Sequence, residues 1–220
     1  MIKMFTVKNV LIGCGILGIP IILVWLGLYT NTIKLSITRT ISHQYVTDFS
    51  DDRKLMGASH NVFVGKVIRQ VGSKSRTGTP ETQFEVEVIH NIKGNLQGSV
   101  TVNQEGGYKN GVLYLIHEGD VVLPADKTDL SLDPLLEPGQ IYLFASRYSE
   151  RDNWYTIISH PNAKANFSLD NNLTKPQLEI LVENNGRVRQ LREAYPNEIL
   201  LDVDVKINNA RNSYKSLQKD

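Results

Sequence analysis

Cysteine is almost absent from this sequence of 220 residues. The single one, Cys14, lies in an apolar stretch, and residues 30–220 contain none. No disulfide can therefore form within that part of the chain, so its stability has to come from a hydrophobic core. About 180 residues follow position 40, which is enough for one domain with a substantial core. Because domains of this size fold without disulfides in secreted proteins too, the shortage of cysteine does not indicate a compartment.

The sequence also lacks a cluster of positive charge. The formal net charge is +1, but residues 1–40 hold four basic residues and no acid. Residues 41–220 therefore carry 20 basic and 23 acidic side chains, a net charge of −3. Nucleic-acid binding depends on clustered Lys and Arg that neutralise phosphates. We therefore expect no nucleic-acid partner.

Motifs of metal sites and of hydrolytic catalysis are missing as well. No serine stands in a Gly-x-Ser-x-Gly context. The five histidines form neither an HExxH motif nor a paired spacing, and we expect surface or strand positions for all of them: His43, His60, His90, His117 and His160. Three aspartates do not follow the calcium-loop pattern and indicate a solvated acidic loop: Asp126, Asp129 and Asp133. We predict no catalytic residue, no metal ligand and no cofactor.

Two further patterns have a binding alternative. Residues 104–108 contain a Gly-Gly pair, as phosphate-binding loops do, but neither a helix start nor a suitably placed lysine follows, which favours a tight turn. Trp154, Tyr155 and Tyr142 are aromatic residues that an OB-type barrel uses as a stacking face. Core and strand positions are the more common role of such residues. The sequence alone does not identify binding residues.

What the sequence does contain is one long apolar run at residues 10–29. Twelve of these twenty residues are Leu, Ile or Val, and no charged residue falls between Lys8 and Lys34. Twenty helical residues extend about 30 Å, the thickness of the hydrocarbon core of a bilayer. Trp25 and Tyr29 lie near one end, where amphipathic rings favour the membrane interface. This pattern predicts a single transmembrane helix that contacts membrane lipid.

Two processing alternatives compete with a permanent anchor. A cleaved signal peptide has a shorter apolar stretch and a small-x-small cleavage site, and residues 29–32 do not provide one. Lipidation of Cys14 would need an apolar run before the cysteine and polar sequence after it, whereas here the run continues to Tyr29. A short N-terminal tail most often stays in the cytoplasm. We therefore predict a cytoplasmic tail at residues 1–9 and place residues 30–220 outside the cell membrane.

The rest of the chain favours a mainly β domain. Residues 30–57 are expected to form a linker and a short helix: residues 30–47 are a polar linker or extended stalk, and residues 50–57 resemble a short helix that begins with acids and ends at glycine. Alternation of apolar and polar residues then predicts five strands, with a bulge or bend at Gly65 and one buried and one wet face in the second strand. These strands are expected at residues 61–71, 82–92, 99–104, 142–145 and 154–158. Five short strands with polar connections favour a small barrel.

Two segments stand apart from these strands. Residues 105–139 form a long insertion between the third and fourth strands, with a short apolar piece at 112–116, and long insertions often carry function. A helix is expected at residues 173–196, capped by Thr174 and ended by Pro196, with a possible split into two helices at residues 184–186. Residues 197–220 are polar and are expected to form either a disordered tail or a last strand at 199–205.

A family resemblance appears in the strand segments. Residues 61–67, 84–88, 93–94, 100–102 and 136–145 resemble the netrin module, the family that includes the tissue inhibitors of metalloproteinases and many bacterial surface proteins. The resemblance implies an OB-type five-stranded barrel over residues 58–168. Those inhibitors chelate the protease zinc through an N-terminal cysteine, which this part of the chain lacks, so their mechanism is not carried over.

Taken together, these features predict a membrane-anchored extracytoplasmic binding or interaction module without catalytic activity. Its partner is expected to be a protein at the cell surface, contacted through the insertion 105–139 and adjacent loops. Two alternatives stay open. One is a cell-surface protease inhibitor or enzyme, as the family resemblance implies. The other is a structural subunit of a membrane complex that docks through the helix at 173–195.

Overall fold

The computed structural model describes residues 37–41, 47–76, 78–117, 132–167 and 173–208. The predicted membrane span at residues 10–29 lies outside these ranges and stays a prediction. Within the described ranges, no helix is both long enough and apolar enough to cross a membrane. The fold described below belongs to the compact unit Thr38–Asp220.

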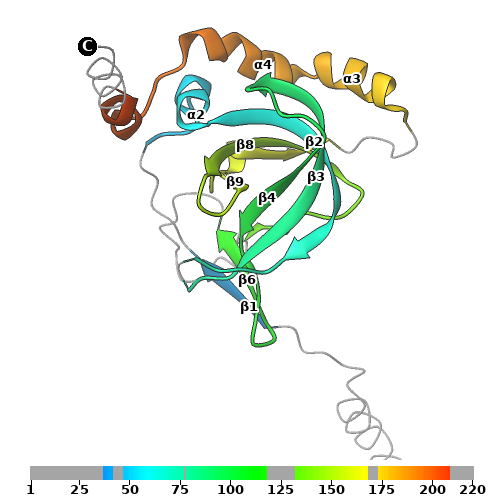
Figure 1. Cartoon of the computed structure of the whole chain (residues 1–220), viewed down its shortest axis with the longest axis vertical. Helices are drawn as coiled ribbons and strands as arrows, with labels where there is room; N and C mark the ends of the chain where they lie inside the picture. Colours follow the sequence, from blue (N-terminus) through cyan, green and yellow to red (C-terminus); the bar gives the residue numbers. More distant parts are fainter. Residues whose placement is uncertain (1–36, 42–46, 77, 118–131, 168–172, 209–220) are drawn as a thin grey trace, which may run out of the picture. The chain divides into compact units, whose positions relative to one another are not determined.

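Five strands close into a barrel, which makes the unit mainly β (Figure 1). They are β2 (Asn61–Gly72), β3 (Glu81–Lys93), β4 (Ser99–Glu105), β8 (Ile141–Ser149) and β9 (Trp154–Ile157). Around the barrel the order is β2, β3, β4, β9 and β8, and β8 pairs again with β2. All of these pairings are antiparallel except that of β4 with β9, which is parallel. The five strands predicted from the sequence are thus confirmed.

The barrel interior is filled by the apolar side of each strand. Phe84 and Val86 of β3 are buried as their alternation predicts, and the rings of Phe63 and Phe144 lie 5.1 Å apart. The register of β2 against β3 shifts at Gly65, which confirms the predicted bulge. A Cβ at this glycine would lie 2.5 Å from Cγ1 of Val86, so only glycine fits where the two strands approach.

The outer side of β3 differs from the sequence prediction. Gln83 was expected on a wet face, yet it is only 4% exposed, and Glu81 is 1% exposed. Glu87, farther along the same face, is exposed as expected. The difference arises because residues 73–76, which follow β2, cover the beginning of the strand and hydrogen-bond to it.

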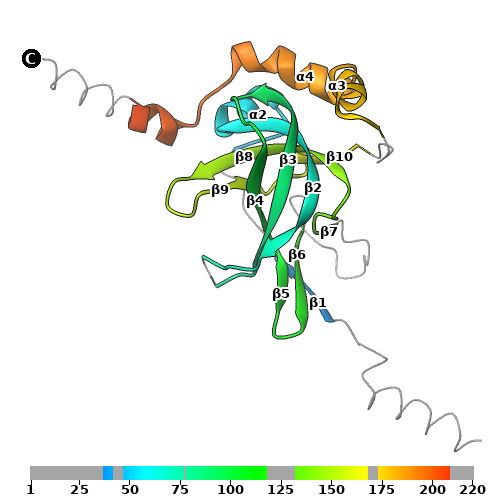
Figure 2. The same ribbon diagram turned by 45° about the vertical axis from the view of Figure 1, so that its right-hand side comes forward.

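Helices gather at one end of the barrel (Figures 1 and 2). The short helix α2 (Asp52–Ala58) confirms the helix predicted at residues 50–57; Asp51 caps its start, but Gly57 lies inside the helix and does not end it. The C-terminal helix is split into α3 (Lys175–Glu183) and α4 (Gly186–Ala194), because the Asn185 side chain accepts a hydrogen bond from the backbone N–H of Arg187 and starts a new helix. Both helices bury apolar residues in the core: Leu178, Val182, Val188 and Leu191.

The insertion after β4 contains more strand than its polar sequence indicates. A hairpin is formed by β5 (Gly107–Lys109) and β6 (Val112–His117), and Asn110 and Gly111 at its tip both have positive φ. Two further strands pair with β6, namely β7 (Leu132–Asp133) and β1 (Ile37–Ile41). Of these, β1 lies in the predicted linker. Figure 2 shows this hairpin projecting from the end of the barrel opposite α3 and α4. Residues 37–41 of the predicted linker or stalk are therefore extended but belong to a sheet.

Three short elements complete the described chain. The 3-10 turn η1 (Pro161–Ala163) leads into β10 (Lys164–Asn166), which pairs with β8, and η2 (Tyr195–Asn197) follows α4. Residues 202–208 are helical, so the alternative of a final strand at 199–205 is wrong. The backbone N–H groups of Asp204 and Val205 both bond to the carbonyl of Leu201, a local turn that takes the place of strand pairing.

Candidate functional site

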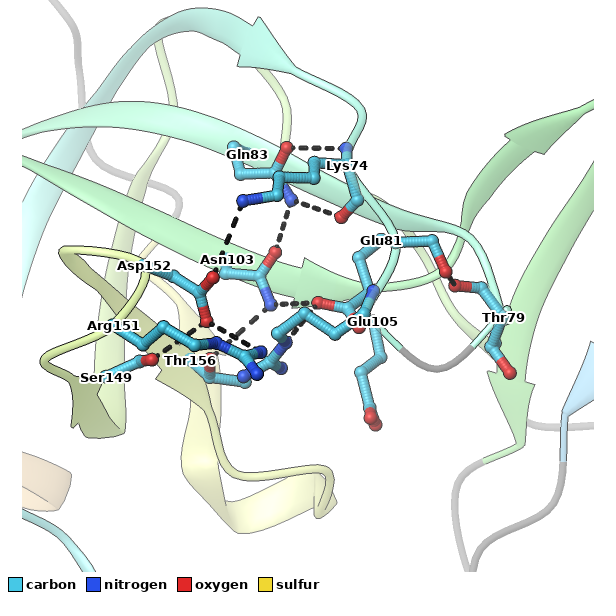
Figure 3. Close-up of polar contacts among 12 residues, drawn as sticks. Lys74, Thr79, Glu81, Gln83, Asn103, Glu105, Ser149, Arg151, Asp152 and Thr156 are labelled. Atoms are coloured by element: carbon cyan, nitrogen blue, oxygen red, sulfur yellow. Dashed lines mark hydrogen bonds and ion pairs between the residues drawn. The ribbon is translucent and has the colours of Figure 1, made fainter.

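The densest cluster of buried polar side chains lies on the outside of the barrel, on neighbouring strands β3, β4 and β9 (Figure 3). We define this polar face by Glu81, Gln83, Asn103, Trp154 and Thr156. Strand register brings the residues together, because Gln83 stands opposite Asn103, and Asn103 opposite Thr156. Residues 73–76 and the turn at 150–153 flank the face.

Gln83 fastens the β2–β3 connection to the sheet. Its Oε1 accepts a hydrogen bond from the backbone N–H of Lys74 at 2.8 Å, and its Nε2 donates to the carbonyl of Lys74 at 3.0 Å. The same Nε2 donates to Oδ1 of Asn103 at 2.5 Å. Figure 3 shows Gln83 between Lys74 and Asn103. One amide therefore positions both a loop and a neighbouring strand.

Glu81 is a buried carboxylate with a complete set of partners. Its Oε2 accepts from Nδ2 of Asn103 at 2.7 Å and from Nε of Arg76 at 2.9 Å. Its Oε1 accepts from the backbone N–H of Arg76 at 3.2 Å. Burial of an ion is tolerated only with such pairing, since an unpaired carboxylate would cost several kcal/mol. Glu81 thus fixes the Arg76 guanidinium over the face.

Trp154 forms the floor of this arrangement. The Lys74 ammonium lies 5.3 Å and the Arg76 guanidinium 5.6 Å from the centre of a Trp154 ring, both within the range of cation–π attraction. The indole is 5% exposed, and its Nε1 is buried without a hydrogen-bond partner among the described residues. A buried donor left unpaired costs about 1–3 kcal/mol.

Asp152 joins the turn at 150–153 to the same cluster. Its carboxylate accepts from Oγ of Ser149 at 2.9 Å and lies 3.5 Å from Nζ of Lys74 and 3.4 Å from Arg151. The pKa of Asp152 lies below its usual value: burial alone would raise it, but hydrogen bonds from Ser149 and Arg151 outweigh burial. Lys74 and Arg151 are exposed, whereas both acids of the cluster are buried. The rim therefore presents positive charge to solvent.

The predicted aromatic residues do not form a single face. Trp154 belongs to the polar face, whereas the Tyr155 ring packs 5.0 Å from Tyr148 and the Tyr142 ring 6.0 Å from Phe144. The Gly-Gly pair at 106–107 connects β4 to β5 with positive φ at both residues, in agreement with the predicted tight turn.

The histidines and aspartates considered as ligands are dispersed. His60 Nδ1 accepts from the backbone N–H of Tyr148, and His160 Nδ1 accepts from that of Asn162. His90 lies 2.7 Å from Arg192, and Asp133 forms an ion pair with Lys164. Within the ranges given above, no three His, Cys, Asp or Glu side chains are grouped for a metal ion. His43, Asp126 and Asp129 lie outside the described residues.

Sequence reasoning missed the polar face. Lys74 and Arg76 belong to one of the polar connections between predicted strands, and Gln83 to a strand face that is predicted to be wet. The usable signal was the register: Gln83 and Asn103 are uncharged amides directly opposite each other on adjacent strands. That signal can be read only when the strand pairing is known.

Comparisons with known proteins assign no function to this face. No protein-family model matches the sequence, and the search of curated proteins found no match. The geometry of the site combines the Trp154 indole, the Arg76 guanidinium that Glu81 holds over it, and exposed cations such as Lys74 at the edge.

Proposed function

We propose that the chain is a binding module of OB type, tethered to a membrane by residues 10–29, which captures an anionic partner on the polar face. The observation that carries this proposal is the position of that face. It lies on the second, third and fifth barrel strands, between the loop joining strands one and two and the turn joining strands four and five. OB barrels bind their ligands in this place.

The strand order supports the OB assignment. Numbered along the chain, the five barrel strands are neighbours in the order one, two, three, five, four, and the third and fifth run parallel. A closed Greek-key barrel of this kind is the OB arrangement. The order also agrees with the netrin-module resemblance of residues 58–168, which we keep as part of the proposal. The inhibitory mechanism of that family is not part of it.

Charge determines the class of partner. Glu81 and Asp152 are buried and form ion pairs with Arg76 and Lys74. An approaching anion would therefore contact the cations of the face and not these two carboxylates. Lys74 and Arg151 extend into solvent at the rim. An acidic segment of a surface protein would form ion pairs with these two cations. Such a partner also fits the extracytoplasmic location that we propose for residues 30–220. The described acids act as anchors for loops, which supports binding over catalysis.

A charge-reversal experiment tests the binding proposal. Full-length protein in phospholipid nanodiscs is titrated with a fluorescent oligo-glutamate peptide, with Lys74→Glu/Arg151→Glu as the variant. We expect the affinity to fall at least tenfold, since two favourable contacts become repulsive. The matched control is Lys175→Glu/Arg189→Glu on the exposed side of α3 and α4. Equal affinity of both variants would refute the proposed site.

The membrane tether has its own test. After alkaline extraction of membranes, the full-length chain is expected in the pellet and a variant lacking residues 10–29 in the supernatant. Protease added to intact cells should then digest residues 38–208 of the tethered protein. Recovery of the full-length chain in the supernatant would refute the tether and leave the polar face unaffected.

A second candidate function has one observation in its favour. On α3, Ile180 is 59% and Leu181 44% exposed, although Leu178 and Val182 of the same helix are buried in the core. An exposed aliphatic pair is typical of a contact surface. It supports the alternative of a structural subunit that docks through α3. Ile180→Asp would release a co-purifying subunit without lowering affinity for oligo-glutamate.

A further inference from the structure

A cavity of about 840 Å³ lies beside α2, and its lining includes Glu105, which stands opposite Glu81 of the polar face in the strand register. Its volume is in the range of pockets that hold small molecules. The walls come from residues before α2, from the helix itself and from residues 199–203 after α4. Its apolar lining includes Phe49, Ala58, Ile158, Ile199, Leu200 and Val203.

The C-terminal wall of this cavity is held in place at both ends. Glu198 forms an ion pair with Lys93, and Asp204 accepts two hydrogen bonds from the Arg147 guanidinium at 2.7 and 2.9 Å. Between them, the backbone N–H of Ile199 donates to the carbonyl of Arg53 at 2.9 Å. The cavity is therefore formed before any ligand arrives, which lowers the cost of binding.

The wall keeps aliphatic side chains in contact with water. Ile199 and Leu200 are each 40% exposed and Val203 is 55% exposed, although all three line the cavity. Transfer of such surface out of water is favourable, so an apolar ligand gains affinity from each side chain that it covers. The chemistry of the wall thus favours a hydrocarbon.

The polar groups of the cavity distinguish an alkyl chain from a peptide. Arg147 is engaged by Asp204, and Glu105 accepts a hydrogen bond from the hydroxyl of Ser159. An extended peptide would bring an N–H and a carbonyl per residue into a largely aliphatic wall, where they would need partners. An alkyl chain has no such groups.

One cation at the cavity is available for an anion. Lys54 lines the cavity and forms no ion pair within 4 Å among the described residues. Hydrogen bonds from Ser50 and Arg53 lower the pKa values of Asp48 and Asp51, and the charge of Lys54 lowers both further without a direct ion pair. Asp202 also lines the cavity, and it is exposed to solvent.

We propose that this cavity binds a single alkyl chain that ends in a carboxylate, a ligand of the fatty-acid class, with the hydrocarbon against residues 199–203 and the carboxylate at Lys54. This inference goes beyond the proposed function and does not depend on the ligand of the polar face. Residues 199–203 would then form part of a ligand-binding site.

Photolabelling tests the proposal in the full-length protein. The protein in nanodiscs is irradiated with a palmitate analogue that carries a diazirine near the end of its chain, and labelled peptides are mapped. We expect label in the peptides that contain residue 49, residue 58 and residues 199–203. Palmitate should compete with this label, and saturated fatty acids from ten to fourteen carbons should compete about fourfold better for each added methylene.

Two variants probe the two halves of the ligand. Val203→Trp fills the cavity and should reduce labelling at least tenfold, and Lys54→Met should weaken competition by palmitate about tenfold while leaving that by hexadecanol unchanged. Ile180→Trp and Lys175→Met, on α3, are the matched controls and should behave as the natural protein does. All four proteins should keep the same melting temperature.

Three outcomes would overturn the proposal. They are label confined to residues 10–29, hexadecanol competing as well as palmitate, and full labelling of Val203→Trp. The first would leave the membrane tether intact, because label at 10–29 is what a transmembrane helix in lipid produces. Failure of the cavity proposal is thus distinguishable from failure of the tether.

Discussion

At the scale of single residues, the molecule depends on polar side chains that look unremarkable in the sequence. Gln83 and Asn103 are ordinary strand amides until the pairing of β3 with β4 places them opposite each other. Each then bonds to a group on another segment, Gln83 to Lys74 in the preceding connection and Asn103 to Glu81 on the neighbouring strand. Propensity and alternation could not predict this, because they describe one segment at a time.

Removal of the Gln83 amide is expected to destabilise the fold. Gln83→Ala leaves the N–H and carbonyl of Lys74 and the Oδ1 of Asn103 without their partner, so we expect a loss of about 2 kcal/mol in the free energy of unfolding. Urea denaturation measures this loss. Glu87→Ala, on the exposed part of the same strand face, is the control and should change stability by less than about 0.5 kcal/mol. Equal effects of both substitutions would show that the amide network contributes nothing.

At the scale of elements, the sequence predicted those whose signal is local. The barrel strands follow alternation, α2 follows its cap, and Asn185 divides the last helix. Elements that depend on a distant partner were missed or misassigned. The strand β1 exists because β6 pairs with it, and residues 199–205 have the β-branched residues of a strand but no neighbouring strand edge to join.

Docking of the C-terminal segment on α2 leads to a prediction at Gly57. A Cβ there would lie 1.9 Å from the carbonyl oxygen of Ile199, although alanine is the better helix former by about 1 kcal/mol. Gly57→Ala should therefore displace residues 198–204, and limited proteolysis should cleave there sooner. Gly186→Ala in α4, where a Cβ meets nothing within 4 Å, should leave the cleavage pattern unchanged. Identical digests of the two variants would contradict this docking.

At the scale of the whole molecule, the stability of the fold depends on pH through two partly buried histidines, His60 and His90. Burial lowers the pKa of His60 and of His90, and the charges of Arg147 and Arg192 lower them further. The unfolded chain then binds protons more readily than the folded one below about pH 6.5. Stability is therefore complete above that pH and decreases as the pH falls toward the lowered pKa values.

The measurement is the free energy of unfolding between pH 7.5 and pH 5. We expect it to decrease on acidification in the natural protein and to decrease less in His60→Asn/His90→Gln, which cannot gain these protons. The pKa of Asp204 is lowered by its hydrogen bond to Arg147, so its contribution is lost only at more acidic pH. An unchanged slope in the double variant would assign the pH dependence to other groups.

The sequence was sufficient to predict a five-stranded barrel, but it was not sufficient to predict the polar face on its outside. Five amphipathic segments have few ways to bury their apolar sides, and closure into a barrel is one of them. The polar face requires in addition the parallel pairing of β4 with β9, which brings Thr156 to Asn103. About fifty residues separate these strands in the sequence, so no local pattern indicates that they meet.

That parallel pairing also governs when the protein can fold. During synthesis β2, β3 and β4 leave the ribosome first, and β4 has no barrel neighbour on its second edge until β9 has been made. An unpaired edge is a site of aggregation, and late long-range pairing slows folding. A chain that ends before residue 154 therefore exposes the second edge of β4 wherever it folds, and we expect such truncated chains to aggregate more readily than the full chain.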